Sequence, residues 1–297
     1  MNSAIEALEE KLSRARTILA GFERAVVAFS GGVDSTLVAK LAQDVLGPQN
    51  TLAATADSPS LAREDLREAT QLAAAIGVSH VVIQTGEVID ARYRANSEAR
   101  CFFCKSVLFE ALERLAVVRG FSAVLYGAIA DDRLAERPGQ RAALRFGVRA
   151  PLQEAGLAKH EVRLAARALG LSNWNRPQNA CLSSRIPHGM GVTEEKLAQV
   201  EAAEAFLRGQ GFRQVRVRHL EAHARIEVEP ESVGRFQDAA LCLAVSQRFE
   251  ALGFETIGVN RSGYRSGGAD HVVTDEIFLG SELGARSSGA TALSPQP

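Results

Sequence analysis

The segment that most limits the possible folds of this chain is residues 25–36, a short apolar run followed by a glycine-rich turn. Ala25-Val26-Val27-Ala28-Phe29 predicts a buried strand, and residues 35–46 predict a helix that stops at Gly47-Pro48. Ser30-Gly31-Gly32-Val33-Asp34-Ser35 lies at this strand-to-helix junction. Such a junction points backbone N–H groups and the positive end of a helix dipole at one place, which favours a bound anion.

The residue types of this turn favour phosphate as the anion. Gly31 and Gly32 let the backbone approach it closely, and Ser30, Ser35 and Thr36 add hydroxyl donors. We also expect Ser35 or Thr36 to serve as a helix cap. The alternative is an ordinary glycine turn after a parallel strand. The chain contains no Gly-Lys pair, which excludes a Walker A loop.

Predicted strands and helices alternate along the first part of the chain. The expected helices are 4–20, 35–46, 62–76, 104–118 and 157–169, and the expected strands are 25–29, 51–56, 80–84 and 123–126. This alternation predicts an α/β fold in which a parallel sheet is covered by helices on both faces.

The pattern changes after residues 174–177. A helix at 194–207, strands at 214–219 and 224–229, a helix at 233–252 and a strand at 254–259 predict a smaller α+β domain. We therefore expect a domain over residues 1–172, a second over 173–281, and a disordered tail, rich in Ser, Ala, Gly and Pro, over 282–297.

The bulk properties exclude several classes of protein. The 297 residues carry a formal net charge of −1, which gives no global reason to bind nucleic acid or an anionic membrane. No apolar run approaches the roughly 20 residues of a membrane span, and the N-terminus lacks the apolar middle of a signal peptide. We expect a cytoplasmic protein that acts on small molecules.

Three of the four cysteines form a candidate site. Cys101 and Cys104 are a C-x-x-C pair near the start of a predicted helix, and Cys181 lies in a polar stretch. Three thiolates suit a [4Fe–4S] cluster with one iron left open for a non-protein ligand. A zinc site, or a redox pair with an independent nucleophile at Cys181, are the alternatives. Cys242 lies in an apolar helix segment and is expected to be a core thiol.

Two further groups of charged residues are less specific. Arg216 and Arg218 alternate with valines, and Arg225 and Glu227 repeat the pattern in the next strand; this alternation alone favours a solvated sheet face. Asp131-Asp132 follows a strand at the carboxyl edge of the sheet, where nucleotides and Mg²⁺ collect. Solvated loop carboxylates are an equal alternative for this pair.

The hexapeptide resembles the PP-loop of the N-type ATP pyrophosphatases, which cleave ATP between the α- and β-phosphates. Most of the chain resembles one family with this loop, LarE, the ATP-dependent sulfur transferases that help build the nickel-pincer cofactor of lactate racemase. The resemblance rests on residues 29–36, Arg100-Cys101-Phe102-Phe103-Cys104-Lys105, Asp131-Asp132, Arg137-Pro138-Gly139, Ala180-Cys181-Leu182-Ser183-Ser184-Arg185-Ile186-Pro187, Val215-Arg216-Val217-Arg218, Ala224-Arg225-Ile226-Glu227 and Gly263-Tyr264-Arg265.

The resemblance implies a PP-loop domain that uses ATP and Mg²⁺. Asp34 is a candidate to hold this metal, and the alternative is a structural Asp that orders the loop. It implies adenylation of a carboxylate on a pyridinium mononucleotide, and then its conversion to a thiocarboxylate. Arg185, Arg216 and Arg218 would grip the phosphate of that substrate. It also implies a homo-oligomer, possibly a hexamer, that meets other nickel-pincer biosynthesis proteins transiently.

The same resemblance bears on the source of sulfur. Cys181 matches the sulfur-donating position of the family. Members with this cysteine alone give up its sulfur and keep dehydroalanine, whereas members that also match Cys101 and Cys104 resemble cluster enzymes. We therefore expect a [4Fe–4S] cluster on the three cysteines, with sacrifice of the Cys181 sulfur as the alternative.

Two other functions, one of them from another class, compete with this interpretation. The first is a PP-loop tRNA thiolase, which needs a broad basic surface that the near-neutral charge does not favour. The second is a zinc-stabilised regulator that binds ATP without releasing pyrophosphate.

Overall fold

The computed structural model describes residues 2–132, 138–177, 179–265 and 275–280. The chain divides into two compact units, Met1–Cys181 and Leu182–Pro297. The first unit thus includes Cys181. The domain limits expected at residues 172 and 281 stay a prediction. Arg137 of the quoted motifs and the expected tail at 282–297 lie outside the described residues.

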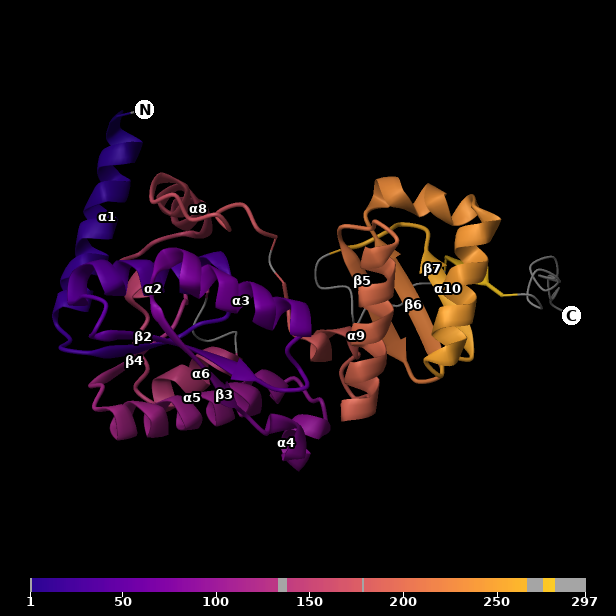
Figure 1. Ribbon diagram of the computed structural model, residues 1–297, viewed down its shortest axis with the longest axis horizontal. Helices are drawn as coiled ribbons and strands as arrows, with labels where there is room; N and C mark the ends of the chain where they lie inside the picture. Colours follow the sequence, from indigo (N-terminus) through magenta and orange to yellow (C-terminus); the bar gives the residue numbers. More distant parts are fainter. Residues whose placement is uncertain (1, 133–137, 178, 266–274, 281–297) are drawn as a thin grey trace, which may run out of the picture. The chain divides into compact units, whose positions relative to one another are not determined.

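The first unit is built on a four-stranded sheet, shown in Figure 1. Its strands are β1 (Ala25–Ala28), β2 (Thr51–Asp57), β3 (Ser79–Gln84) and β4 (Ala123–Leu125), in the order β3-β2-β1-β4. All neighbouring pairs are parallel. The expected α/β class is confirmed, because the apolar strands need helices on both faces to leave water.

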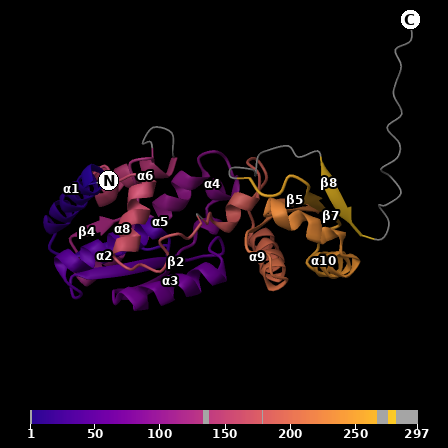
Figure 2. The same cartoon turned by 90° about the horizontal axis from the view of Figure 1, so that it is seen from above.

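Helices cover both faces of this sheet (Figure 2). The elements are α1 (Asn2–Ala20), α2 (Val33–Leu46), α3 (Arg63–Ile76), η1 (Glu87–Ile89), α4 (Ala91–Arg94), α5 (Arg100–Arg119), α6 (Pro138–Arg145), α7 (Pro151–Glu154) and α8 (Lys159–Ala168). Val27 packs into the core with α1, α2 and α8, and Val26 packs into the opposite core with α5 and α6. None of the described helices is long and apolar enough to span a membrane.

Helices α2 and α5 begin earlier than the sequence indicates, and this moves candidate residues onto their first turns. α2 begins at Val33 rather than at residue 35, and α5 begins at Arg100 rather than at residue 104. Asp34 and Cys101 therefore lie where backbone N–H groups are free of intrahelical partners. The short helices α4, α6 and α7 were not predicted, because they span too few turns to show a helical period.

The second unit contains a mixed four-stranded sheet. It comprises η2 (Leu182–Arg185), α9 (Glu194–Gly209), β5 (Val215–Leu220), β6 (His223–Val228), η3 (Pro230–Gln237), α10 (Ala239–Ala251), β7 (Thr256–Asn260) and β8 (Glu276–Leu279). The order is β5-β6-β7-β8, with β6 and β7 parallel and the other pairs antiparallel. Its core lies between this sheet, α9 and α10.

The single helix predicted at 233–252 is wrong. The segment forms η3 and then α10, and the break lies at Asp238. The Asp238 carboxylate accepts a hydrogen bond from the Ala240 N–H at 2.9 Å, which caps α10. A capping side chain that satisfies a free N–H favours a new helix over continuation of the old one.

Candidate active site

The turn between β1 and α2 adopts a conformation that only glycine accepts without strain at one position. Gly31 has φ +71°, and a Cβ atom there would lie 3.1 Å from the Cα and Cβ atoms of Ala69 on α3. Gly32 is the N-cap of α2, with no side-chain cap. No side chain therefore caps the positive end of α2, and the N–H groups of its first turn are available to an anion.

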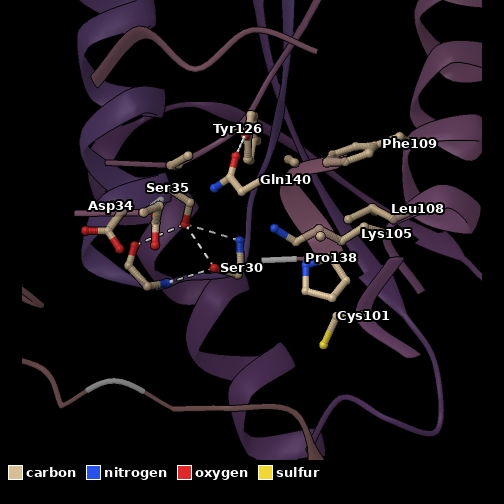
Figure 3. Close-up of a pocket in the computed structure, with 16 residues that line it drawn as sticks. Ser30, Asp34, Ser35, Cys101, Lys105, Leu108, Phe109, Tyr126, Pro138 and Gln140 are labelled. Carbon is tan, nitrogen blue, oxygen red and sulfur yellow. Dashed lines mark hydrogen bonds between the residues drawn. The ribbon is translucent and has the colours of Figure 1, made fainter. Parts of the chain in front are cut away.

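The hydroxyls of the turn hold its shape, and Figure 3 shows this network. The Ser30 N–H donates to Ser35 Oγ at 3.2 Å, and the two serine hydroxyls lie 3.2 Å apart. Ser35 Oγ and Thr36 Oγ1 donate to the Gly32 carbonyl at 3.0 and 2.9 Å. The expectation that Ser35 or Thr36 caps α2 is therefore wrong, because both hydroxyls bond backwards to a carbonyl from within the first turn.

Asp34 is paired with a lysine that is distant in the sequence but belongs to the same unit. Lys159 Nζ, on the first residue of α8, lies 2.9 and 2.7 Å from the two Asp34 carboxylate oxygens. Burial raises the pKa of Asp34 above its usual value, although the lysine opposes this shift. Lys159 was missed by the sequence analysis, because 125 positions separate it from Asp34 and no local motif marks it.

The two acidic residues after β4 lie in the same neighbourhood. Asp131 Oδ2 accepts from the Lys159 backbone N–H at 2.6 Å, and Asp132 Oδ2 accepts from the Ile129 N–H at 3.1 Å. Asp34 and Asp132 line the same cavity, and the charge of Asp132 contributes to the raised pKa of Asp34. One or two carboxylates beside phosphates are what Mg²⁺ takes from a protein, and Asp34 with Asp132 fits that donor set.

A cavity of about 410 Å³ opens on one side of the turn. Figure 3 shows Ser30 and Ser35 on one wall and Lys105, Leu108 and Phe109 of α5 on the other. Gly127 also lines the cavity, and it packs so closely on the first turn of α2 that a Cβ there would lie 2.6 Å from the Ser35 nitrogen. An apolar wall opposite an anion-binding turn suits a nucleotide.

The side-chain amide of Gln140 lines the same cavity and is held by a hydrogen bond from Tyr126. Tyr126 Oη donates to Gln140 Oε1, and both residues are buried. Burial raises the pKa of Tyr126 to about 12, so the phenol stays protonated and remains a donor at neutral pH. The sequence analysis did not select Tyr126 or Gln140, because a single Tyr and a single Gln carry no motif.

A second cavity, of about 290 Å³, opens on the other side of the turn. Asp34, Lys159, Arg176 and Cys181 line it together with Ser30 and Gly32. Cys101 lines the first cavity. The turn at residues 30–36, called the phosphate turn below, therefore borders two cavities, and a cysteine lines each of them.

The three candidate cysteines all belong to the first unit, and Cys101 and Cys104 lie on the first turns of α5. Cys101 and Cys181 are exposed, and Cys104 is partly buried. Burial raises the pKa of the Cys104 thiol well above its usual range, and Glu87, Cys181 and Cys101 add to this through their negative charges. The set of three thiols fits the ligand chemistry of a cluster. Within the described residues, however, no group of three Cys, His, Asp or Glu side chains is arranged to hold a metal ion.

The remaining cysteine lies elsewhere. Cys242 is partly buried against the core of the second unit, and its thiol contacts the Phe236 carbonyl oxygen at 3.0 Å. It is thus a packed thiol in the second unit, whereas the candidate cysteines lie in the first.

In the second unit the candidate arginines are buried, which overturns the expectation of a solvated sheet face. Arg216 and Arg218 are 7% and 4% exposed. Arg185 donates to both Glu204 carboxylate oxygens at 2.8 and 3.1 Å, and Arg218 donates to Glu227 at 2.9 Å. Alternation cannot reveal this burial, because it shows which residues share a face and not what covers that face.

The buried group has more positive than negative charge. Its described members are Arg185, Arg216, Arg218 and Arg225 on one side and Glu204 and Glu227 on the other, and the half-buried Arg208 also pairs with Glu204. Burial and the nearby Arg185 lower the pKa of Arg216, which stands 5.3 Å from the ring centre of Tyr264. Such an excess of arginine attracts an anion such as a phosphate.

These features define a class of protein. Residues 4–117 match the NAD synthase family model. A parallel sheet that directs a Ser-Gly-Gly-x-Asp-Ser turn at an anion site, in a chain matched by that model, is the fold of the ATP-using PP-loop enzymes. The class implies ATP and Mg²⁺ as cofactors.

Relatives give the particular family. The chain is 37% identical over 256 residues to pyridinium-3,5-bisthiocarboxylic acid mononucleotide synthase of Lactiplantibacillus plantarum. The aligned region covers 86% of this chain and 92% of the relative. The chain belongs to this LarE family. An uncharacterized Synechocystis protein is 46% identical over 90% of this chain and 99% of its own. An NH(3)-dependent NAD(+) synthetase of Fusobacterium nucleatum is 31% identical over 41% of this chain and 44% of its own.

Proposed function

We propose that this protein is an ATP-dependent sulfur transferase of nickel-pincer cofactor biosynthesis. Its substrate would be pyridinium-3,5-biscarboxylic acid mononucleotide, whose carboxylates it converts to thiocarboxylates. The observation that carries the proposal is the phosphate turn at residues 30–36 with a cysteine-lined cavity on each side. Membership of the synthase family supports the choice of substrate.

The first step would be adenylation. A substrate carboxylate oxygen attacks the α-phosphorus of ATP, the bond to the β-phosphate oxygen breaks, and pyrophosphate leaves. The backbone N–H groups at Gly31 and Gly32 bind the phosphates, and Lys159 offsets the charge that develops on the leaving group. Asp34 and Asp132 are the residues that would hold Mg²⁺, which neutralises phosphate charge when bound.

The second step would be sulfur transfer. A sulfur nucleophile attacks the acyl carbon, and AMP leaves with the electron pair of the broken C–O bond. Cys101, Cys104 and Cys181 are the residues that would hold a [4Fe–4S] cluster. The cluster would supply an iron that carries hydrosulfide. The exposure of Cys101 and Cys181 leaves this side of the site open to the adenylate.

The alternative within the family uses the protein's own sulfur. Here the Cys181 thiolate attacks the adenylate, AMP leaves, and loss of the Cys181 α-proton breaks the Cβ–S bond. The products are a thiocarboxylate and a dehydroalanine at position 181, about 34 Da lighter than cysteine. The exposed position of Cys181 beside the phosphate turn favours Cys181 as the nucleophile in this case.

The adenylation test is ATP–pyrophosphate exchange. We expect exchange of labelled pyrophosphate into ATP only when the biscarboxylic mononucleotide is present, and thiocarboxylate in the product mass spectrum. Exchange stimulated by tRNA instead would favour a tRNA thiolase. ATP binding without any exchange would favour a zinc-stabilised regulator.

The sulfur source is tested by the iron, zinc and acid-labile sulfide content of anaerobically purified protein. About four iron and four sulfide per chain, lost in Cys101→Ala and retained in Cys242→Ala, is the expected result. Protein without iron that loses about 34 Da at residue 181 during one turnover would instead establish the sacrificial route.

We also propose that the protein is a homo-oligomer, with a hexamer as the first candidate, and that it meets other nickel-pincer biosynthesis proteins transiently. Light scattering coupled to size-exclusion chromatography gives the mass of the particle and tests the assembly directly.

A further inference from the structure

The segment that leads to Cys181 is tied to the phosphate turn by side chains that the proposed mechanism does not use. Asn173 is buried, and its Nδ2 donates to the Gly31 carbonyl at 2.9 Å and to Thr36 Oγ1 at 3.0 Å. These bonds fix the beginning of the segment against the turn itself.

Arg176 continues the connection. Its Nη1 donates to the Gly31 carbonyl at 3.3 Å, and its Nη2 donates to Asp65 Oδ1 at 2.8 Å. The same guanidinium forms an ion pair with Glu68. Asp65 lies in the first turn of α3, so Arg176 joins that helix to the phosphate turn.

Asn179 makes the last connection before the cysteine. Its Nδ2 lies 2.9 and 2.7 Å from the two carboxylate oxygens of Asp65. Asp65 thus accepts hydrogen bonds from Arg176 and from Asn179, on both sides of Pro177. Asp65 therefore joins both Arg176 and Asn179 to α3. Glu68, which pairs with Arg176, and Arg163, which donates to the Arg176 carbonyl at 3.4 Å, hold Arg176 as well but do not reach Asn179.

We propose that Asp65 is a positioning residue that holds the Cys181 segment beside the phosphate turn, so that the sulfur step takes place where the adenylate forms. The inference rests on the proposed function and adds a residue to it. Asp65 and Cys181 both line the cavity that contains Asp34 and Lys159. A reacting group held within about an ångström of its place gains far more in rate than a tethered but mobile one.

The ordinary alternative is that Asp65 only stabilises α3, because an acidic residue in a first turn interacts favourably with the helix dipole. Glu64 provides the matched control. It lies in the same first turn, it is exposed, and its partner Arg67 belongs to the same helix. A dipole role predicts the same behaviour for both carboxylates, whereas a positioning role predicts a difference.

The experiment compares Asp65→Ala with Glu64→Ala in the full-length protein. The rate of alkylation of Cys181 is measured by peptide mass spectrometry on protein freed of iron by a chelator, since a thiolate bound to iron does not react, with and without ATP and Mg²⁺ and with Cys242 as the internal reference. We expect ATP to slow alkylation of Cys181 at least about 5-fold in the wild type and in Glu64→Ala. The reason is that Cys181 lines the same cavity as the turn that would bind the phosphates. In Asp65→Ala the protection should fall below about 2-fold while the affinity for ATP stays within about 2-fold.

Turnover gives the second readout. In Asp65→Ala, thiocarboxylate formation per adenylate should fall about 10-fold or more, while ATP–pyrophosphate exchange remains near the wild-type rate. Asp65→Asn keeps one acceptor oxygen and should give an intermediate loss if the alanine variant folds poorly. Unchanged protection of Cys181 in Asp65→Ala, or equal losses in exchange and in transfer, would overturn the proposal.

Failure of the proposed function is distinguishable from failure of this inference. A wild-type protein that neither exchanges pyrophosphate nor makes thiocarboxylate, yet shows Asp65-dependent protection of Cys181 by ATP, would reject the sulfur-transfer function and keep the positioning role.

Discussion

Lys159 Nζ lies 2.7 and 2.9 Å from the two carboxylate oxygens of Asp34, and this pair links the first turn of α8 to the first turn of α2. The backbone N–H of the same lysine donates to Asp131 at 2.6 Å. One residue therefore connects the phosphate turn with the acidic loop after β4. A cation held at this position is available to the phosphates without a large movement of the chain.

Replacement of Lys159 should impair adenylation more than folding. We expect Lys159→Met to lower ATP–pyrophosphate exchange about 100-fold, because a charged donor to the developing pyrophosphate is lost. Lys40→Met is the control, since Lys40 belongs to α2 but pairs only with Asp44 on the same helix. Similar rates in both variants would remove Lys159 from the mechanism.

The same variant should change the pH dependence of the reaction. Lys159 lowers the pKa of Asp34 against the stronger effect of burial, so its removal raises that pKa further. Asp34 must be ionised to bind Mg²⁺, and the acidic limb of the residual exchange activity should therefore move to higher pH. An acidic limb at the wild-type pH would show that Asp34 is not the group that titrates.

Gly31 offers a test of the turn geometry. Gly31→Ala should destabilise the first unit by about 1–3 kcal/mol, because its φ of +71° strains an L-residue and the new Cβ would contact Ala69 at 3.1 Å. Gly147→Ala is the matched control, with φ +60° and open space around its Cβ. Urea unfolding should show a smaller loss for Gly147→Ala, and only Gly31→Ala should weaken ATP binding.

Glu204 tests the energetics of the buried charges in the second unit. The carboxylate is fully buried between Arg185 and Arg208 and also accepts from the Val217 N–H at 3.1 Å. Glu204→Ala leaves Arg185 buried without this partner, and we expect a loss of about 3–5 kcal/mol. Glu194→Ala, an exposed position on the same helix, should cost less than about 1 kcal/mol by the same urea titration.

His219 should make the second unit sensitive to mild acid. Burial, and then the charge of Lys196, lower its pKa to about 4, and its Nδ1 is buried without a hydrogen-bond partner. Since the unfolded chain has a His pKa near 6.5, the unfolded state binds the proton first, and stability falls as the pH drops from about 6.5 to about 4.

Two variants separate this effect from general acid denaturation. His219→Phe keeps a ring against Phe254 and should flatten the stability profile between these pH values. His160→Gln, at an exposed histidine of the first unit, should leave the profile unchanged. A wild-type profile in His219→Phe would assign the acid sensitivity to other groups.

The sequence by itself determined the features that repeat over short distances. The apolar strands at residues 25–28 and 51–57, the helices between them and the glycine turn that joins β1 to α2 follow from local periodicity and from residues with special backbone preferences. The C-x-x-C pair was equally visible, because one helical turn places both thiols on the same face.

Only the tertiary structure decided which distant residues meet. Lys159 donates to Asp34 across 125 positions of the sequence, and Asn179 donates to Asp65 across 114. No local motif distinguishes any of these partners from an ordinary surface residue. Burial of Arg216 and Arg218 was likewise invisible, since alternation is the same on a wet face and on a covered one. Pairing between distant residues depends on how the helices and strands pack together. The packing energy arises from contacts between segments, so the pattern of one segment does not predict it.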